Sequence, residues 1–327
     1  MILTFLDLCS GIGGGRLGLE NAGMKCIGYC DTSRLANITY NLIHSTDGEL
    51  FFTNIKKIAK DSLPLYDVLI AGFPCQTFSV IGRQNGFNDS RGQIIFTLCD
   101  ILKFSQPKYF ILENVKGLVT HNNGETYKTI LKALHEAGYR GYSKVLTTFD
   151  YGIPQNRQRI YFIGIRNDLF CENLFQWPSC RKSNQIESFF LDDMPISEEN
   201  LFYFKRYLMN PTNNNKYSLD EILSMENMII DTRMNDLRLY REKMPTLRSQ
   251  RDGIYYVHHH QLYQLTGTEA LLFQGFPYEK IKDLKTKVSD RHLLMQAGNA
   301  MSVNVIEELG KSIAHYNNQI IKQNGGS

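Results

Sequence analysis

Cys75 is the side chain in this 327-residue sequence best suited to covalent chemistry. It follows an apolar run, residues 68–71, after a short Gly-Phe-Pro link. Such a run predicts a buried strand, and the carboxyl ends of strands in an open α/β sheet border the crevice where ligands bind. Cysteine is the best side-chain nucleophile near neutral pH when a helix start or a nearby cation lowers its pKa. The segment by itself predicts either a nucleophile or a buried structural cysteine.

Glu113 is a candidate general acid for the same crevice. It ends the next apolar run, residues 109–112, so its carboxyl group would lie on the same edge of the sheet as Cys75. A carboxyl group bordering an apolar strand is costly to ionise, which favours the protonated form that a general acid needs. The alternative is an ordinary carboxylate at the start of a helix.

Arg157 and Arg159 form a candidate pair of cations. They lie two positions apart at the entrance to a predicted strand, residues 160–165, so both side chains are expected on one face. Paired guanidinium groups can hold carboxylates, base carbonyls or phosphates. The alternative is a solvated pair at the edge of the sheet.

A glycine-rich turn, with Gly11 and Gly13, follows the first predicted strand, residues 3–8. Glycines there let a ligand approach the backbone, and Asp31, at the end of the second strand, is placed to bind ribose hydroxyls. Arg16 stands where the dinucleotide fingerprint has its third glycine. The turn therefore favours a nucleoside cofactor without pyrophosphate, while another nucleotide or a bare tight turn stays open.

The order of the elements predicts an α/β fold with a doubly wound, mostly parallel sheet. Strands are expected at residues 3–8, 25–29, 68–71, 109–112, 144–147 and 160–165. Helices are expected between them at residues 16–22, 33–42, 94–104 and 126–137, with a closing helix at residues 309–321. From about residue 183 to residue 264 the sequence is polar and aperiodic, which predicts a second, smaller and irregular domain.

The composition fits a soluble cytoplasmic protein, with 43% hydrophobic and 21% charged residues. No apolar run reaches the roughly 18 residues of a membrane span, and no secretory signal is visible at the start. Seven cysteines without paired spacing argue against disulfides. The formal charge of +3 permits a nucleic-acid partner without requiring one.

Three consecutive histidines, His258 to His260, raise the question of a metal. On a strand, consecutive side chains point to opposite faces, so these imidazoles are not expected to converge on one ion. We therefore expect no metal site.

Five motifs in order resemble the cytosine-5 DNA methyltransferase family. They are Asp-Leu-x-x-Gly-x-Gly-Gly, Gly-Phe-Pro-Cys-Gln-x-Phe-Ser, Glu-Asn-Val, Gln-x-Arg-x-Arg and Gln-x-Gly-Asn, at residues 7–14, 72–79, 113–115, 155–159 and 296–299. No single motif is decisive, but the set spans nearly the whole chain. It is similar to compact bacterial and phage enzymes of modification systems.

The resemblance implies a catalytic set of Cys75, Glu113, Arg159 and Arg157. The thiolate would add to carbon 6 of cytosine, Glu113 would hydrogen-bond ring nitrogen 3, and Arg159 would hold the base carbonyl or Glu113. Because these atoms lie inside the duplex, the base must be flipped out. Part of a mobile loop, Ile81, Arg83 and Gln84, would close behind it.

The resemblance also implies S-adenosylmethionine as the cofactor. The residues expected to bind it are Phe5, Gly11, Gly13, Asp31, Asn54, Ile55, Pro74, Ile94 and Asn299. Two departures concern the adenine. Thr32 stands where the family commonly has an aromatic residue, and Asn54 stands where it commonly has aspartate, although an asparagine carbonyl can still accept a hydrogen bond from the amino group.

Double-stranded DNA is the implied partner. A Pro-Thr-Leu element similar to that of the family's target-recognition domain includes Thr246 and Leu247. At least one of Arg233, Arg248 and Arg251 is expected to touch a base, since arginines suit guanine edges; a generic phosphate-facing surface is the alternative.

The resemblance implies a division into three parts. Residues 1–183 and 291–327 would form the catalytic, cofactor-binding domain, residues 184–263 the target-recognition domain, and residues 264–290 a hinge. We expect a monomer of prokaryotic or phage origin. The resemblance also implies a cognate restriction endonuclease that acts separately, and the sequence leaves open whether one exists.

Two other functions remain open. One branch of the family methylates tRNA, but it tends to have a second proline before its Pro-Cys, where this chain has Phe73. A DNA-binding protein that has kept the fold without the chemistry is the other, and the presence of both Cys75 and Glu113 argues against it.

Overall fold

The computed structural model describes residues 2–74, 93–214, 216–249 and 253–324. The chain forms two compact units: residues 1–146, 158–180 and 301–327 make up unit 1, and residues 147–157 and 181–300 make up unit 2. Five residues singled out above, Cys75, Ile81, Arg83, Gln84 and Arg251, lie outside the described residues.

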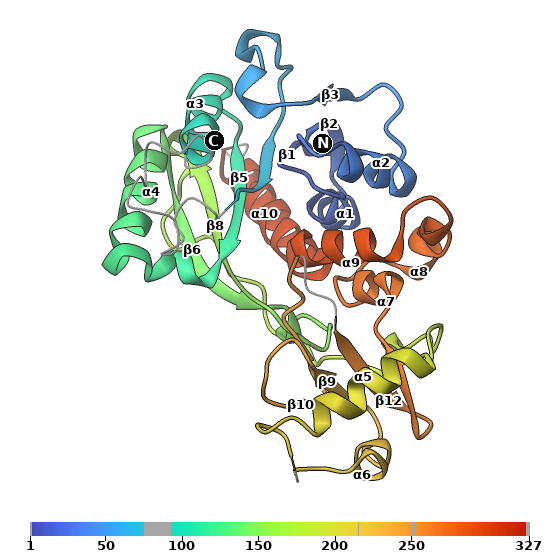
Figure 1. Cartoon of the computed structure of the whole chain (residues 1–327). Coiled ribbons are helices and arrows are strands. Elements are labelled where there is room, and N and C mark those ends of the chain that lie inside the picture. Colours follow the sequence, from blue (N-terminus) through green and yellow to red (C-terminus); the bar gives the residue numbers. More distant parts are fainter. Residues whose placement is uncertain (1, 75–92, 215, 250–252, 325–327) are drawn as a thin grey trace. The chain divides into compact units, whose positions relative to one another are not determined.

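A seven-stranded sheet forms the centre of unit 1, in the order β3-β2-β1-β4-β5-β8-β6 (Figure 1). Its strands are β1 Thr4–Leu8, β2 Lys25–Cys30, β3 Leu50–Phe52, β4 Val68–Gly72, β5 Tyr109–Val115, β6 Tyr139–Thr147 and β8 Gln158–Arg166. The pairs among β1 to β5 are parallel, and β8 runs antiparallel to β5. The predicted mostly parallel sheet is confirmed, and β3, which is short, is an additional edge strand.

Helices cover both faces of this sheet. They are α1 Gly14–Asn21, α2 Arg34–Ile43, α3 Gln93–Ser105, α4 Glu125–Glu136 and α10 Val303–Asn324. The side chains of β4 point alternately to the two faces of the sheet. Leu69 and Ala71 belong to the core beneath α3 and α4, whereas Ile70 lies against Gly15 of α1 on the other face. The doubly wound arrangement expected from the sequence is therefore confirmed.

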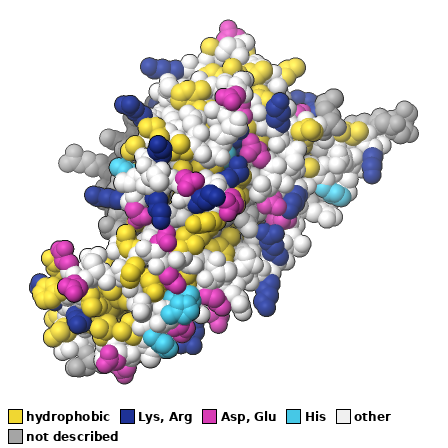
Figure 2. Space-filling model, turned by 90° about the vertical axis from the view of Figure 1, so that its right-hand side faces the viewer, with side chains coloured by type: hydrophobic (Ala, Val, Ile, Leu, Met, Phe, Trp, Pro, Cys, Tyr) yellow, Lys and Arg dark blue, Asp and Glu magenta, His cyan; other side chains and the backbone are white. Residues whose placement is uncertain are grey.

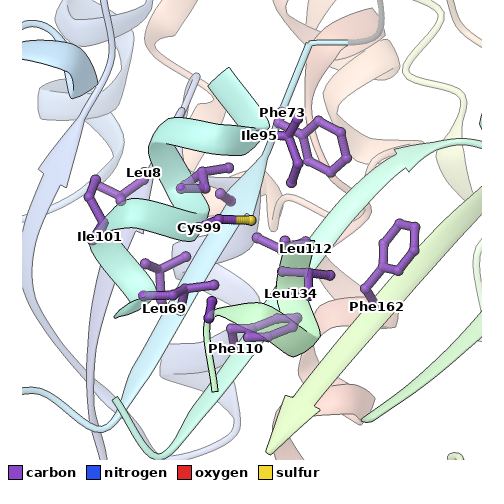
Figure 3. Packing of buried hydrophobic residues seen from close by; sticks show 14 of the residues in the cluster. Leu8, Leu69, Phe73, Ile95, Cys99, Ile101, Phe110, Leu112, Leu134 and Phe162 are labelled. Atoms are coloured by element: carbon purple, nitrogen blue, oxygen red, sulfur yellow. The ribbon is translucent and has the colours of Figure 1, made fainter. Parts of the chain in front are cut away.

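The core between the sheet, α3 and α4 is apolar and tightly packed. Phe110, Leu112 and Phe162 from the sheet face Ile95 and Leu134 from the helices (Figure 3). Each of these side chains is buried, and each apolar side chain buried in this way contributes about 1.5 to 3 kcal/mol. This packing holds the edge of the sheet on which the candidate site lies.

Unit 2 contains an antiparallel four-stranded sheet in the order β10-β9-β12-β13. Its strands are β9 Met228–Asp231, β10 Arg238–Arg241, β12 Ile254–His258 and β13 Gln261–Gln264. The helices α5 Glu198–Leu208 and α6 Leu219–Leu223 share a hydrophobic cluster with this sheet. Two further short strands, β7 Gln155–Asn156 and β11 Met244–Pro245, pair with each other. The expected second, smaller domain is thus confirmed, with more regular structure than its sequence indicates.

The boundaries of the compact units differ from the expected functional division. Unit 2 also includes residues 147–157 and the helices α7 Gly267–Leu272, α8 Tyr278–Ile281 and α9 Asp290–Asn299. Helices α7 and α9 pack closely, since a Cβ on Gly267 would lie 2.4 Å from Leu293 Cβ. Compactness does not test which residues bind DNA or cofactor, so the division into catalytic domain, recognition domain and hinge stays a prediction.

Within the described ranges, no helix has both the length and the apolar character needed to cross a membrane.

Gly164 of β8 is a position where the sheet core has no room for a side chain. It is the register partner of Phe110, and an added Cβ would lie 1.9 Å from Cε1 of that ring. We expect Gly164→Ala to lower the free energy of unfolding by about 2 kcal/mol, because the ring must leave its packed position. Urea denaturation measures the change.

Gly117→Ala is the matched control, because nothing lies within 4 Å of its added Cβ and its φ is not left-handed. It should leave stability unchanged or raise it by about 0.5 kcal/mol. Equal stabilities of the two variants would contradict the packing described for Phe110.

Candidate active site

The carboxyl ends of β4 and β5 bring Glu113 beside the segment that leads to Cys75. Gly72 and Glu113 are register partners, and Glu113 Oε2 lies 3.6 Å from the position that a Cβ on Gly72 would take. Asn114 Nδ2 donates a hydrogen bond of 3.0 Å to the carbonyl oxygen of Phe73. This bond fixes the link that carries Pro74, the last described residue before Cys75.

Glu113 is held by Arg159. The register of β5 and β8 pairs Val115 with Arg159, and the guanidinium Nε lies 3.1 Å from Glu113 Oε1. The two side chains are only 11% and 13% exposed. Arg159 and Glu113 form an ion pair, but the angle at the guanidinium does not suit a hydrogen bond. Glu113 Oε1 therefore accepts no hydrogen bond within the described part of the chain. Arg159 therefore fixes the orientation of the Glu113 carboxyl group at the end of β5.

Arg157 has a different environment from Arg159, contrary to the expected paired role. Its guanidinium is buried and donates to the carbonyl oxygens of Leu247, Gly298 and Ala300 at 3.1, 3.2 and 2.8 Å. These three bonds tie residues on either side of Asn299 to the Pro-Thr-Leu element in unit 2. Arg157 is therefore placed to position this backbone, and its expected catalytic role has no direct support.

The glycine turn has the geometry that the motif predicts. Gly11 and Gly13 have φ values of 57° and 81°, in the left-handed region that favours glycine. Gly11 N donates to Asp31 Oδ2 at 2.9 Å, so the expected ribose-binding carboxylate borders the turn. A Cβ on Gly13 would lie 2.2 Å from His44 Nε2. The turn is thus tight, with Gly11 partly exposed and Gly13 buried.

Arg16 explains why the third glycine of the dinucleotide fingerprint is absent. Its buried guanidinium binds Glu49 at 2.6 and 2.8 Å and Glu20 at 2.7 Å, below the glycine turn. Asp7 is buried in the same network and accepts a hydrogen bond from Tyr40 Oη at 3.3 Å. Burial raises the pKa of Asp7 to about 8, against the opposing effect of Arg16. No sequence motif indicates this network, because its members lie far apart along the chain.

The other expected cofactor residues differ in accessibility. Phe5 is fully buried, which leaves its side chain no surface for a ligand, so its expected contact is not supported. Cys9, which is partly exposed with a φ of 52°, borders the turn instead and was missed. Asn54 Oδ1 already accepts a hydrogen bond of 2.9 Å from Lys56 N, which leaves one lone pair for an adenine amino group.

The remaining four expected cofactor residues differ in exposure. Pro74 and Ile94 are partly exposed in unit 1, whereas Asn299 is exposed at the end of α9 in unit 2. Ile55 is buried.

A polar pocket in unit 2 contains several of the expected DNA-reading residues. Its lining is Asn156, Asp231, Arg233, Met234, Arg238, Tyr240, Pro245, Thr246 and Arg248. Asp231 and Arg233 form a two-point ion pair, with Nε–Oδ1 and Nη2–Oδ2 distances of 2.6 and 2.5 Å. Burial opposes ionisation of Asp231, but the bonds from Arg233 prevail and hold the pKa of that carboxyl below its usual value.

Arg233 has a buried Nη1 group, which carries two N–H donors that Asp231 does not use. Its side chain is only 8% exposed, and its Nη1 makes no hydrogen bond within the described residues. Arg248 is exposed beside it in the lining, whereas Leu247 is buried and offers no side chain for DNA contact. Thr246 Oγ1 donates to Asn156 O at 2.5 Å, which anchors the Pro-Thr-Leu element.

A glycine turn with a bordering carboxylate, and a held glutamate beside the link that ends at Pro74, are the arrangement expected of a methyltransferase. The family model described as C-5 cytosine-specific DNA methylase matches residues 3–315, and the chain belongs to this family. By class it is a DNA (cytosine-5-)-methyltransferase.

Curated relatives cover nearly the full length. The chain is 35% identical to the type II methyltransferase M.NgoBI of Neisseria gonorrhoeae, over 94% of this chain and 91% of the relative. It is 32% identical to the type II methyltransferase M.HhaI of Haemophilus parahaemolyticus, over 95% and 94%. A crystal structure of a prophage DNA modification methyltransferase from E. coli has the same fold, with a TM-score of 0.70, 21% identity, and coverage of 97% and 99%.

Arg157→Lys tests the positioning role. A lysine ammonium cannot reproduce the planar fork, so at least one of the three buried carbonyls should lose its partner. We expect the free energy of unfolding to fall by on the order of 2 kcal/mol in urea denaturation. Arg206→Lys, on the exposed surface of α5 in the same unit, should change it by less than about 0.5 kcal/mol. A loss no larger than that of the control would remove Arg157 as a positioning residue.

Proposed function

We propose that this chain transfers a methyl group from S-adenosylmethionine to carbon 5 of a flipped-out cytosine in a specific short duplex DNA sequence, through a covalent bond to Cys75. The observation that carries the proposal is Glu113, held by Arg159 next to the link that leads to Cys75. A thiol that attacks carbon 6 and a carboxyl group that binds ring nitrogen 3 are the two groups that activation of a cytosine ring requires.

The chemistry follows from the electronic character of cytosine. Carbon 5 is a poor nucleophile until the Cys75 thiolate adds to carbon 6, which pushes electron density through the ring. Glu113, protonated when the base is bound, would donate a hydrogen bond to ring nitrogen 3, which neutralises part of that charge and favours the addition. Carbon 5 of the enamine would then form a bond to the methyl carbon, and the electron pair of the broken carbon–sulfur bond would stay on the cofactor's sulfur. Loss of the carbon 5 proton to a base in the solvent would return the electron pair that expels the Cys75 thiolate.

The residues around the glycine turn fit S-adenosylmethionine. It supplies a methyl group made electrophilic by the sulfonium sulfur. The left-handed turn is partly exposed at Gly11, and Asp31, which binds Gly11 N, would bind the ribose hydroxyls. Ile55, Pro74, Ile94 and Asn299 remain proposed contacts, with Asn54 accepting from the adenine amino group.

The polar pocket would read the DNA. Arg233, held by Asp231, presents a preorganised donor of the kind that pairs with guanine, and Arg248 adds a second guanidinium. Thr246 would contact the strand backbone, with Arg251 as a further base or phosphate contact. Ile81, Arg83 and Gln84 would fill the space that the flipped base leaves.

The setting proposed for this activity is the cytoplasm of a bacterial or phage-infected cell, as part of a type II restriction-modification system. The two relatives named above are type II methyltransferases, which supports this setting. We propose that the protein acts as a monomer.

Cys75→Ala should abolish transfer of a labelled methyl group to duplex DNA, because no other nucleophile replaces the thiolate. Cys180→Ala, at an exposed cysteine, is the control and should keep full activity. Duplex DNA with 5-fluorocytosine should trap an adduct on Cys75, since fluorine at carbon 5 cannot leave as a proton does.

The same assay with tRNA tests the substrate class. Incorporation into tRNA alone would overturn the DNA proposal, and an adduct on another residue, or full activity of Cys75→Ala, would overturn the nucleophile.

Arg233→Lys should relax the DNA sequence preference. A lysine cannot bind Asp231 at two points and also offer a fixed donor to a base. We therefore expect the discrimination at one base pair to fall by about 1 to 3 kcal/mol, or roughly 5- to 150-fold. Bisulfite sequencing of DNA methylated by the purified variant measures this, with Arg206→Lys as the control. Unchanged selectivity would show that Arg233 does not read a base.

A further inference from the structure

The three consecutive histidines do not lie on one strand. β12 ends at His258 and β13 begins at Gln261, its register partner. His259 and His260 form the two-residue turn, with φ values of 50° and 58°. Left-handed conformations at both central residues are those of a type I′ hairpin turn, and histidine tolerates them better than most residues.

This turn overturns the expectation that the imidazoles point apart. The rings of His258 and His259 lie 3.9 Å apart between centroids, because the alternation of a strand ends where the turn begins. On one face of the molecule, histidine side chains gather beside acidic ones (Figure 2).

Asp192 completes a group of three. Its Oδ2 lies 2.8 Å from His258 Nδ1, and one ligand atom from each of Asp192, His258 and His259 lies within 4.8 Å of the others. Among the described residues, this is the one group of three histidine, cysteine, aspartate or glutamate side chains that converges in this way. Asp192 comes from a segment 66 positions before His258.

Surrounding groups hold both parts of the cluster. Tyr256 Oη accepts a hydrogen bond of 3.0 Å from Asp192 N and lies 3.2 Å from Asp192 Oδ1. The same hydroxyl group donates a hydrogen bond of 2.6 Å to Glu269. Glu226 accepts from His259 N at 2.7 Å, which fixes the turn. Metal sites commonly have such outer partners, which orient the ligands before the ion arrives.

We propose that Asp192, His258 and His259 bind one divalent transition-metal ion, with Zn²⁺ as the best fit. Two imidazole nitrogens and one carboxylate oxygen suit Zn²⁺, which prefers four ligands, so water completes the set. Zn²⁺ bonds of about 2.0 to 2.2 Å place ligand atoms roughly 3.4 Å apart, and small side-chain rotations bring these three to that spacing.

The ion would take the place of the hydrogen bond between His258 Nδ1 and Asp192. It would join the segment before α5 to the β12–β13 hairpin, so its role is structural. The proposal is independent of the proposed DNA chemistry, because none of the three residues belongs to the proposed catalytic or cofactor set.

Isothermal titration of the full-length, chelator-treated protein with Zn²⁺ tests the site, and His260 provides a matched control in the same turn. We expect His259→Ala to weaken the affinity of this site at least about tenfold, and His260→Ala to leave it unchanged. Zn²⁺ should also raise the Tm of the wild type and of His260→Ala more than that of His259→Ala. Zinc bound to free thiols contributes equally to all three proteins, so the difference reports the proposed site.

Co²⁺ gives a second readout through its visible absorption. The wild type and His260→Ala should show bands of a four- or five-coordinate ion that His259→Ala lacks. Equal Zn²⁺ binding by the wild type and His259→Ala, or an equal loss in His259→Ala and His260→Ala, would overturn the proposal. In that case the His258–Asp192 contact is an ordinary surface hydrogen bond.

Discussion

The parallel pairing of β1, β4 and β5 is the constraint on which the candidate site depends. Parallel strands in register end on the same edge, so the turn after β1, the link after β4 and the last residues of β5 open together. Gly11, Pro74 and Glu113 are brought to one edge by this pairing alone. The hydrophobic core beneath α3 and α4 then keeps the strands from sliding, because a slip of one residue would turn Leu69 and Leu112 out of the core.

Arginine–carboxylate pairs recur at the two proposed working sites with one shared property. In Glu113–Arg159 and in Asp231–Arg233, both charges are nearly buried, and breaking such a pair costs about 3 to 5 kcal/mol. In each pair, one polar atom, Glu113 Oε1 or Arg233 Nη1, has no hydrogen bond within the described residues. Buried polar atoms of this kind are uncommon and need an explanation. In the proposed function, a bound base would supply a polar partner to each pair.

Much of unit 1 could be predicted from the sequence, because its central strands are continuous apolar runs and its glycine turn has a fixed spacing. Individual side chains were harder to predict. One reason is that a rule for side-chain direction within a strand does not apply beyond the residues of that strand. Arg157 and Arg159 were expected on one face, but Arg157 lies between β7 and β8, which belong to different sheets. Alternation holds only within one strand. Phe5 and Leu247 were matched by motif alone, and a motif does not say which side chains the core will bury.

Unit 2 was harder to predict because its strands of four or five residues are too short for periodicity to show, and its key contacts are between backbones. Gly298 illustrates this point, since an added Cβ would lie 2.3 Å from Ser249 N. The glycine lets the backbone beside Arg248 approach that beside Asn299, and Arg157 holds both through Leu247, Gly298 and Ala300. The backbone that carries Arg248 therefore packs directly against the end of α9. The proposed DNA-reading and cofactor-binding residues of this unit are thus joined by direct packing and by the hydrogen bonds of one buried guanidinium.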